Sequence, residues 1–194
     1  MSTLSIAAYL PRSRANGPGL RSVLWVQGCP FRCADCFNPD FLPFSGGQQA
    51  TPAEVAGWML AEAETEGVSF SGGEPFAQAA ALAEVAAAVR DAGKSVLVFT
   101  GYSAAELSAS RNPGIRRLLA SADVLVAGRY QADSPGTHPL LSSANQQLVH
   151  LSPRYREHDF SAPRRSEIRI ARGGAVTLTG FPAAGLRQRT IAAA

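Results

Sequence analysis

The sequence predicts an α/β fold built on a parallel sheet, and two observations carry this prediction. Apolar runs of strand length, such as 95–99 and 123–127, alternate along the chain with capped helical segments. These runs are almost wholly apolar, which is typical of strands that a parallel sheet buries on both faces. Near the C-terminus, two further short strands flank a glycine pair. We therefore expect an α/β core followed by a C-terminal β-hairpin.

The chain length also limits the domain organisation. A chain of 194 residues has the size of one ordinary domain. Hydrophobic residues make up 46% of it and charged residues 17%, which excludes a disordered chain. We expect one domain over 1–194, with a core over about 17–151 and an extension that contains the hairpin over about 152–187.

The first expected strand covers 20–27, where β-branched and aromatic residues precede Gly28. The segment 38–50 contains two prolines and a glycine pair, which indicate a loop. The next four residues, Thr51-Pro52-Ala53-Glu54, form a capping box with proline at the first helical position. They predict a helix over 52–66.

The pattern of strand and helix then repeats. In chain order it predicts a strand over 68–71, a helix over 76–92, a strand over 94–100, short helices opened by Ser103 and by Asn112, and a strand over 123–127. A loop over 131–144 and a fifth strand over 146–151 follow. The hairpin is expected from strands over 167–171 and 175–179, and a frayed tail beyond Arg187.

Several segments directly follow the predicted strands, and parallel strands end at a common edge. These segments are the cysteine-containing loop after 20–27, the turn 72–75, the residues 100–102 and the residues 128–129. Ligands of such sheets bind at the carboxyl ends of the strands. We therefore expect the four segments to gather at one rim of the sheet.

The three cysteines lie within eight residues, at Cys29, Cys33 and Cys36. An odd number of cysteines argues against a disulfide framework. Thiolates at this spacing can turn toward one soft metal centre, for which zinc and an iron–sulfur cluster are the candidates. Unliganded thiols are the remaining alternative.

The two metal candidates differ in the ligands that they need. Structural zinc requires a fourth protein ligand, and the histidines His138, His150 and His158 lie far downstream, so we expect them to be non-ligands. A cubane cluster has four irons, of which three cysteines would leave one open. An open coordination position indicates chemistry rather than structure alone, so the pattern favours a cluster.

Two motifs on consecutive strand ends resemble those of the radical S-adenosylmethionine (SAM) superfamily. The first runs from Gly28-Cys29-Pro30 to Cys36-Phe37-Asn38, and the second is the run 69–75, Ser-Phe-Ser-Gly-Gly-Glu-Pro. Within the superfamily, the runs 100–102, 123–130 and 143–146 resemble those of the small activating enzymes of glycyl radical enzymes, especially the anaerobic ribonucleotide reductase activases. The resemblance covers about 17–151.

The resemblance implies a fold, two cofactors and a reaction. The fold would be a partial, open (β/α) barrel of parallel strands in a single radical SAM domain. The cofactors would be a [4Fe-4S] cluster and SAM, and the protein would be an oxidoreductase. SAM would be cleaved reductively to methionine and a 5′-deoxyadenosyl radical, which abstracts a hydrogen atom from the substrate.

The resemblance also assigns roles to particular residues, and each has a plainer alternative. The three cysteines would hold the cluster, and the SAM-binding set would be Phe37, Asn38, Ser71, Gly72, Gly73, Glu74, Thr100 and Arg129. Glu74 would accept from the amino group of SAM, or could serve only as a favourable charge at a helix N-terminus. Arg129 would pair with the SAM carboxylate, or be a solvated loop arginine. No catalytic side chain is assigned.

Three functions remain open at this point. The first is activation of a glycyl radical enzyme, with a flavodoxin or ferredoxin as the implied electron donor. The second is a stand-alone radical SAM enzyme that modifies a small molecule or a peptide. The third is a non-catalytic binding module stabilised by a metal or cluster.

The net charge and the length of the apolar runs indicate which classes of partner to expect. The net charge is only +3, and the densest basic group, Arg164, Arg165, Arg169 and Arg172, is either a solvated face or a docking patch for an acidic partner. No apolar run approaches the ~20 residues of a membrane span, and residues 1–11 show no basic leader. We therefore expect a cytoplasmic protein with neither a nucleic acid nor a membrane as partner.

Overall fold

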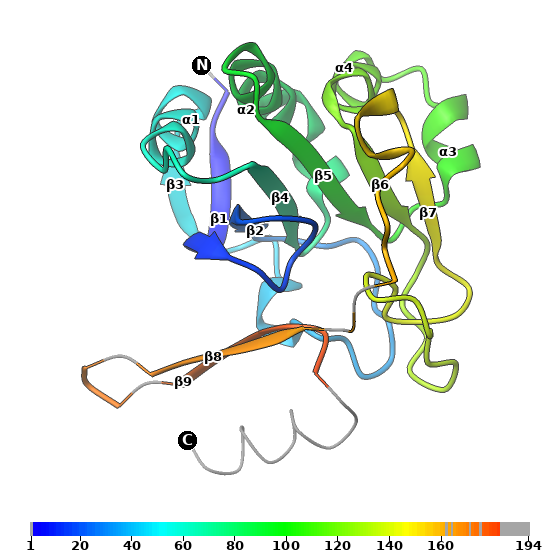
Figure 1. Cartoon of the computed structure of the whole chain (residues 1–194). Coiled ribbons are helices and arrows are strands. Elements are labelled where there is room, and N and C mark those ends of the chain that lie inside the picture. The colour runs from blue at the N-terminus through cyan, green and yellow to red at the C-terminus, as the bar shows by residue number, and fades with distance from the viewer. Residues whose placement is uncertain (1, 162, 164, 171, 175, 183–194) are drawn as a thin grey trace.

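The computed structural model describes residues 2–161, 163, 165–170, 172–174 and 176–182. Its central sheet contains seven strands in the order β3-β1-β2-β4-β5-β6-β7 (Figure 1). The bounds of these strands are β1 Leu4–Ser13, β2 Arg21–Val26, β3 Gln48–Ala50, β4 Gly67–Gly72, β5 Ser95–Thr100, β6 Val124–Ala127 and β7 Gln147–His150.

The centre of this sheet is parallel and its two ends are antiparallel. Strands β2, β4, β5 and β6 pair in parallel, whereas β1 pairs antiparallel with β2 and β3, and β7 pairs antiparallel with β6. The order of the strands makes β3 and β7 the two edges, so the sheet is open. The predicted α/β class with a parallel core is confirmed, while its description as a partial barrel stays a prediction.

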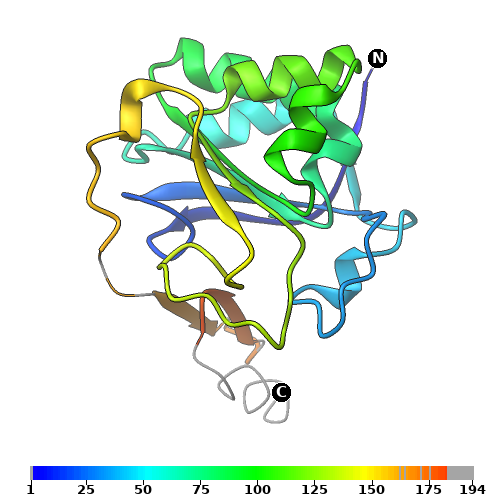
Figure 2. The same cartoon turned by 90° about the vertical axis from the view of Figure 1, so that its right-hand side faces the viewer.

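The helices cover one face of the sheet (Figures 1 and 2). Their bounds are α1 Pro52–Leu60, α2 Ala79–Asp91, α3 Ala104–Ala109 and α4 Pro113–Ser121, with 3-10 turns η1 Pro39–Phe41, η2 Pro75–Gln78 and η3 Pro153–Tyr155. The predicted capping residues act as such: Thr51 forms a reciprocal capping box with Glu54, Ser103 caps α3, and Asn112 accepts from the N–H of Gly114 at the start of α4.

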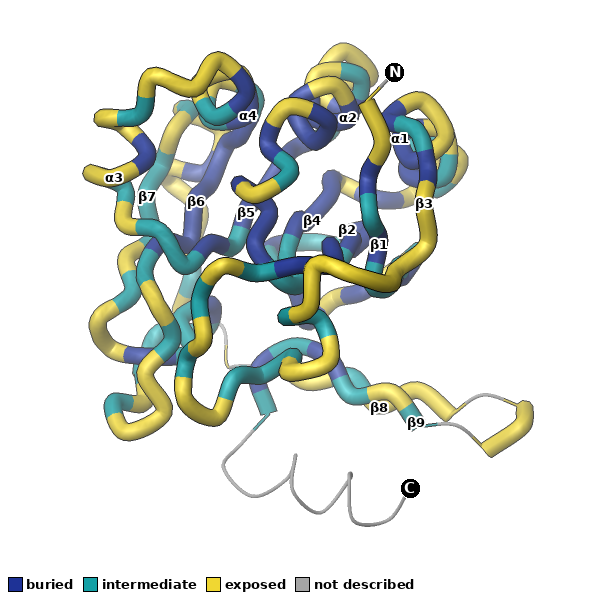
Figure 3. Tube along the Cα trace, turned by 180° about the vertical axis from the view of Figure 1, so that it is seen from behind, coloured by how far each residue is buried: buried dark blue, intermediate teal, exposed yellow. Residues whose placement is uncertain are grey.

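The apolar residues of the central strands pack into hydrophobic clusters on both faces of the sheet. In β5, Val96 and Val98 pack into the cluster under the helices, while Leu97 and Phe99 pack into a second cluster on the opposite face. This alternation explains why the strand is apolar throughout. Figure 3 shows the buried residues concentrated along the central strands. The second cluster includes Phe181, which follows the C-terminal hairpin.

A fully buried arginine fixes the amino-terminal end of the parallel strands. Arg21 on β2 donates to the Ser69 hydroxyl on β4 at 2.9 Å and to the Ser95 hydroxyl on β5 at 2.9 Å. It also donates to the hydroxyl of Tyr155 at 3.2 Å. Burial lowers the pKa of Arg21, which nevertheless stays charged because its ordinary pKa is so high. The residue therefore links three strands at the end opposite to their carboxyl termini.

The C-terminal hairpin consists of β8 Ser166–Ile170 and β9 Val176–Gly180, in the register Ile168↔Leu178. The predicted hairpin is confirmed over these residues. The predicted strand ends at 171 and 175, and the predicted tail beyond Arg187, lie outside the described residues. In Figures 1 and 2 the hairpin lies below the sheet, on the side away from the helices.

The structure corrects three sequence-based predictions. A strand, β1, precedes the first predicted one, and β3 lies inside the segment 38–50 that the sequence assigns to a loop. The helix predicted over 52–66 ends at Leu60. In the segment after this end, the Lys94 ammonium group donates to the carbonyl oxygens of Glu62 and Thr65 at 2.9 and 2.6 Å. The segment is therefore fixed by a distant side chain instead of by helical hydrogen bonds.

Candidate functional site

A cavity of about 510 Å³ lies at the carboxyl ends of β2, β4, β5 and β6. The segments that follow these strands line it, namely the cysteine loop (residues 28–38), Ser71–Glu74, Thr100–Gly101 and Gly128. The prediction that these segments gather at one rim is confirmed. The volume falls within the ~300–1,000 Å³ of small-molecule and cofactor sites. The cavity is therefore large enough for a cofactor and part of a substrate.

Backbone hydrogen bonds place the cysteine loop against the chain that follows it. The N–H of Gly28 donates to the Phe41 carbonyl at 2.8 Å, and the N–H of Cys29 donates to the Leu42 carbonyl at 3.0 Å. Asp35 adopts a left-handed backbone conformation, with φ of 52°, which turns the chain sharply before Cys36. The N–H of Asn38 donates to the Cys36 sulfur at 3.4 Å.

Two aromatic pairs connect the same loop to the neighbouring strand ends. Phe31 packs edge-on against Tyr102, which follows β5, with ring centroids 4.7 Å apart. Phe37 packs edge-on against Tyr130, which follows β6, at 5.1 Å. Edge-to-face pairs of this kind are worth about 0.5–1.5 kcal/mol each beyond their buried area. The loop is thus held by Phe31, between its first two cysteines, and by Phe37, directly after its third.

The donor set of the cavity fits an iron–sulfur cluster. All three cysteines are thiols outside any disulfide, and all are half-buried and part of the cavity lining. Burial raises the pKa of the Cys29 thiol to about 11, so binding of a positively charged metal centre must displace its proton. Within the described residues, no three Cys, His, Asp or Glu side chains gather closely enough for a single metal ion. A cubane takes each thiolate on a separate iron, so three cysteines that line one cavity could hold three of its four irons.

The glycine pair after β4 lies close to backbone on both sides. At Gly72, φ is 111°, and a Cβ atom would lie 2.4 Å from the nitrogen of Val26. At Gly73, a Cβ atom would lie 2.2 Å from the Gly28 carbonyl oxygen. The N–H of Gly73 donates to the Val26 carbonyl at 2.8 Å. These glycines therefore allow the turn to lie directly against the start of the cysteine loop.

Glu74 is buried beneath the cavity and joins the ends of β4 and β5. One carboxylate oxygen accepts from the N–H of Phe76 at 2.8 Å and from the Thr100 hydroxyl at 2.9 Å, and the other accepts from the N–H of Gly101 at 2.8 Å. Its predicted place at a helix N-terminus is thus confirmed at η2. Because a carboxylate has about four acceptor sites, three bonds leave room for a further donor from the cavity. Its role toward SAM stays a prediction.

The pKa of Glu74 leads to a test of the stability of the cluster-free protein. Burial raises this pKa from 4.5 to about 7, against the effect of its three hydrogen bonds. The stability that Glu74 contributes is therefore fully present below pH 4.5 and is lost as the pH rises through 7. The urea concentration at the unfolding midpoint of the wild-type protein should fall as the pH is raised from 5 to 8. The Glu74→Gln variant should be less stable at pH 5, but its midpoint should depend less on pH. An equal slope in both proteins would contradict the assignment.

The other predicted SAM-binding residues are distributed as follows. Phe37, Asn38, Ser71 and Thr100 line the cavity, whereas Arg129 is not part of its described lining. The Arg129 side chain is 60% exposed, and its guanidinium lies 4.7 Å from the centre of the Phe31 ring. The histidines His138, His150 and His158 lie around Phe160, with ring centroids 4.7–5.8 Å from it.

Sequence reasoning missed two groups of residues at the site. Phe31 carries the contacts to Tyr102 and Arg129, and its position between Cys29 and Cys33 was the only available signal. The second group is strand β9, because Val176–Gly180 and the next two residues line the same cavity as the cysteines. The sequence places the hairpin more than a hundred residues from the cysteine loop and gives no signal for this contact.

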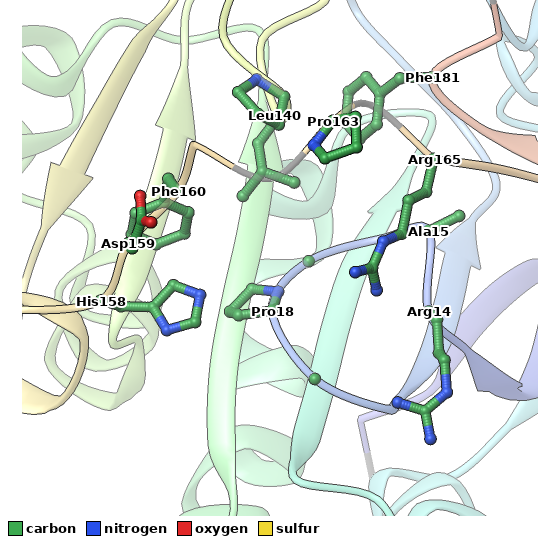
Figure 4. Close-up of a pocket in the computed structure, with 13 residues that line it drawn as sticks. Arg14, Ala15, Pro18, Leu140, His158, Asp159, Phe160, Pro163, Arg165 and Phe181 are labelled. Atoms are coloured by element: carbon green, nitrogen blue, oxygen red, sulfur yellow. The ribbon is translucent and has the colours of Figure 1, made fainter.

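A second cavity of about 190 Å³ shares Phe181 with the first, since this residue belongs to both linings. Figure 4 shows the smaller cavity, whose lining includes Arg14, Pro18, His158 and Arg165, and none of the three cysteines. Arg14 and Arg165 come from segments far apart in the chain.

Comparison with known proteins places this arrangement in a family. Residues 15–150 match the model described as the 4Fe-4S single cluster domain, so the match includes every cysteine and the strands β2 to β6. The chain belongs to this 4Fe-4S family. The match favours the cluster over the structural zinc that the sequence left open.

The relatives of this 4Fe-4S protein are activating proteins. It is 35% identical over 154 residues to the anaerobic ribonucleoside-triphosphate reductase-activating protein of Vibrio cholerae, covering 73% of this chain and 94% of that one. The protein of the same name from Escherichia coli is 28% identical, covering 73% and 95%. The pyruvate formate-lyase-activating enzyme of Clostridium pasteurianum is 34% identical over 93 residues, covering 45% and 39%. The resemblance to radical SAM activating enzymes is confirmed.

Two further observations complete the comparison. Among solved structures, QueE from Escherichia coli aligns with 64% of this chain and 70% of its own, at a TM-score of 0.41 and 14% identity. Among the described residues, no helix has the length and apolar composition that crossing a membrane requires.

Proposed function

We propose that this chain is a radical SAM activating enzyme that generates a glycyl radical on a partner protein of the anaerobic ribonucleotide reductase type. The observation that carries the proposal is the joint placement of Cys29, Cys33, Cys36 and the Gly72–Glu74 turn around one cavity. Relatives that align over 94–95% of their own length are named as activating proteins of this reductase. A reduced flavodoxin or ferredoxin is the electron donor that we propose.

The chain's own residues would hold two cofactors in this cavity. The three thiolates would bind three irons of a [4Fe-4S] cluster, and SAM would occupy the fourth. When bound, the reduced cluster supplies the electron that cleaves SAM to methionine and a 5′-deoxyadenosyl radical, which takes a hydrogen atom from the substrate glycine. Gly72 and Gly73 line the cavity and would offer backbone groups to the methionine part, and Glu74 would hold that turn in place.

Polar residues at the strand ends would orient SAM. Asn38 donates to the Gly72 carbonyl at 3.4 Å and lines the cavity together with Ser71 and Thr100. Phe37 contributes an apolar wall, since its ring is fixed against Tyr130. A closed apolar wall limits access of water, which protects a radical from side reactions.

Substitution of Arg129 tests whether this residue belongs to the SAM-binding set. If Arg129 pairs with the SAM carboxylate, Arg129→Ala should raise the KM for SAM about tenfold, as expected for a lost charge-assisted hydrogen bond. The free energy of unfolding should fall by only about 0.5–1 kcal/mol, because the contact with Phe31 is an exposed cation–π interaction. Arg129→Lys is the matched control that keeps the charge. An unchanged KM in the alanine variant would show that Arg129 only supports the cysteine loop.

The proposed function is tested with anaerobically reconstituted protein. Reduction in the presence of SAM should yield methionine and 5′-deoxyadenosine, and addition of the organism's anaerobic ribonucleoside-triphosphate reductase should yield a glycyl radical signal by electron paramagnetic resonance. Failure to cleave SAM would leave a binding module stabilised by its cluster.

One observation favours a second candidate, a stand-alone radical SAM enzyme that modifies a small molecule or peptide. Strand β9 lines part of the cavity, yet it lies beyond residue 150, where the family match ends. A cavity wall outside the matched region could accommodate a different substrate. SAM cleavage without radical transfer to the reductase would support this candidate.

A further inference from the structure

Strand β9 presents its edge to the cysteine-lined cavity. Val176, Thr177, Leu178, Thr179 and Gly180 all line that cavity, whereas none of the residues of β8 does. Successive side chains of a strand point to opposite faces, so a strand that offers a flat face contributes only alternate residues. Five consecutive lining residues therefore indicate that the outer edge of β9, opposite to β8, borders the cavity.

The register shows which backbone groups this edge offers. The N–H of Phe181 donates to the Arg165 carbonyl at 2.9 Å. The pairs two and four residues further along the ladder are Thr179↔Glu167 and Thr177↔Arg169. Hydrogen-bonded pairs alternate with non-bonded pairs in an antiparallel ladder. Thr177 and Thr179 thus bond to β8, while the N–H and C=O groups of Val176 and Leu178 point away from it. Within the described residues, no backbone hydrogen bond reaches these groups from outside the hairpin.

The hairpin is anchored so that this edge keeps its place. Thr179 exchanges hydrogen bonds with Asn16, with distances of 3.1 and 3.2 Å, and Glu167 accepts from the N–H of Arg14 at 2.7 Å. Phe181 is buried and packs against Phe99 of β5. These contacts attach one face of the hairpin to the loop after β1 and its base to the core.

The other face of the hairpin is apolar. Ile168 and Ile170 are 52% and 73% exposed, and their cross-strand partners Leu178 and Val176 lie on the same face. Exposed isoleucines beside a strand edge with which no described residue pairs are suited to a protein-binding surface. A small-molecule substrate would leave these side chains uncovered.

We propose that the outer edge of β9 binds an extended segment of the protein substrate by strand addition and guides it into the cluster cavity. This inference rests on the proposed function and names how its polypeptide substrate is taken. Backbone hydrogen bonds supply affinity in strand addition, and side-chain pockets supply specificity. The edge is continuous with the cavity that Cys29, Cys33 and Cys36 line. A segment paired with Val176 and Leu178 would therefore enter the cavity in extended form.

Hydrogen exchange tests the pairing residue by residue. The reconstituted protein is mixed with the organism's anaerobic ribonucleoside-triphosphate reductase, and amide exchange is followed along β9. The amides of Val176 and Leu178 should exchange more slowly in the complex, whereas those of Thr177 and Thr179, already bonded to β8, should not change. Binding of the reductase without slower exchange at Val176 and Leu178 would overturn the proposal.

Substitution at Leu178 gives an independent test. Leu178→Pro removes an outward N–H and leaves the ladder to β8 intact, because proline is tolerated at a strand edge. Binding of the reductase should weaken about fivefold, the effect of one lost backbone hydrogen bond. Leu178→Ala, which keeps the N–H, is the matched control, and iron content verifies that each variant is folded and loaded. Equal weakening by both variants would assign the effect to the side chain and overturn strand addition.

Two outcomes separate the possible failures. If the Val176 and Leu178 amides of the full-length protein alone already exchange as slowly as those of Thr177 and Thr179, the edge is occupied without the reductase, and the proposal is overturned. If the wild-type protein generates no radical on the reductase, the proposed function itself fails. Radical formation by the wild-type protein, with unchanged exchange along β9, refutes only the strand addition.

Discussion

Replacing Cys36 with serine is expected to abolish the function of the protein. A serine hydroxyl is a poor ligand for a soft iron–sulfur centre, and the loop offers no fourth cysteine as a substitute. SAM cleavage should fall by about 100-fold or more, because even residues that only support a metal ligand contribute 10- to 100-fold. The measurement is iron and sulfide content after anaerobic reconstitution, followed by the yield of 5′-deoxyadenosine.

His158→Ala is the matched control for this variant. His158 is exposed, and its ring packs against Phe160 rather than lining the cysteine cavity. Its iron content and SAM cleavage should equal those of the wild-type protein. A Cys36→Ser variant that keeps its iron and its activity, or a His158→Ala variant that loses both, would refute the ligand assignment.

Replacing Gly73 with alanine is expected to destabilise the fold strongly. The new Cβ would lie 2.2 and 2.7 Å from the oxygen and carbon of the Gly28 carbonyl and 2.8 Å from the Phe41 carbonyl oxygen. These are backbone atoms, which cannot move away as a flexible side chain would. The free energy of unfolding should fall by about 3 kcal/mol, as is typical of overpacking in closely packed surroundings. Urea unfolding of the cluster-free protein measures this loss.

Gly57→Ala in α1 is the matched control, because the same methyl group is added where there is room. Gly57 is exposed, and an added Cβ would meet nothing within 4 Å. Alanine in a helix interior should raise the free energy of unfolding by about 0.5–1 kcal/mol. Gly73→Ala and Gly57→Ala should therefore shift the unfolding midpoint in opposite directions. A neutral Gly73→Ala would mean that the turn does not lie against Gly28 as described.

The parallel core could be predicted from the sequence because its signals are local. Capping residues such as Thr51 and Ser103 bind backbone within three residues, so they mark helix starts whatever the rest of the chain does. The apolar runs of β5 and β6 reflect burial on both faces, which the sequence shows directly. The cysteine spacing is likewise readable within eight residues.

The elements that escaped prediction depend on contacts far along the chain. Strand β1 contains Pro11, which argues against a strand unless it lies at an irregularity, and the ladder with β2 shifts its register between Leu10 and Ser13. The non-helical segment after α1 is bound by Lys94, about thirty residues away. Strand β9 reaches the cavity only because Thr179 and Phe181 dock on distant segments. Local patterns carry none of this information.

The way in which the cysteine loop is held bears on how the protein matures. Its backbone bonds from Gly28 and Cys29 and its aromatic pairs involve polypeptide alone. None of these contacts uses a cysteine sulfur. They would therefore restrict the conformations of the loop while the cluster is being inserted, and would reduce the conformational entropy that is lost when the thiolates bind it.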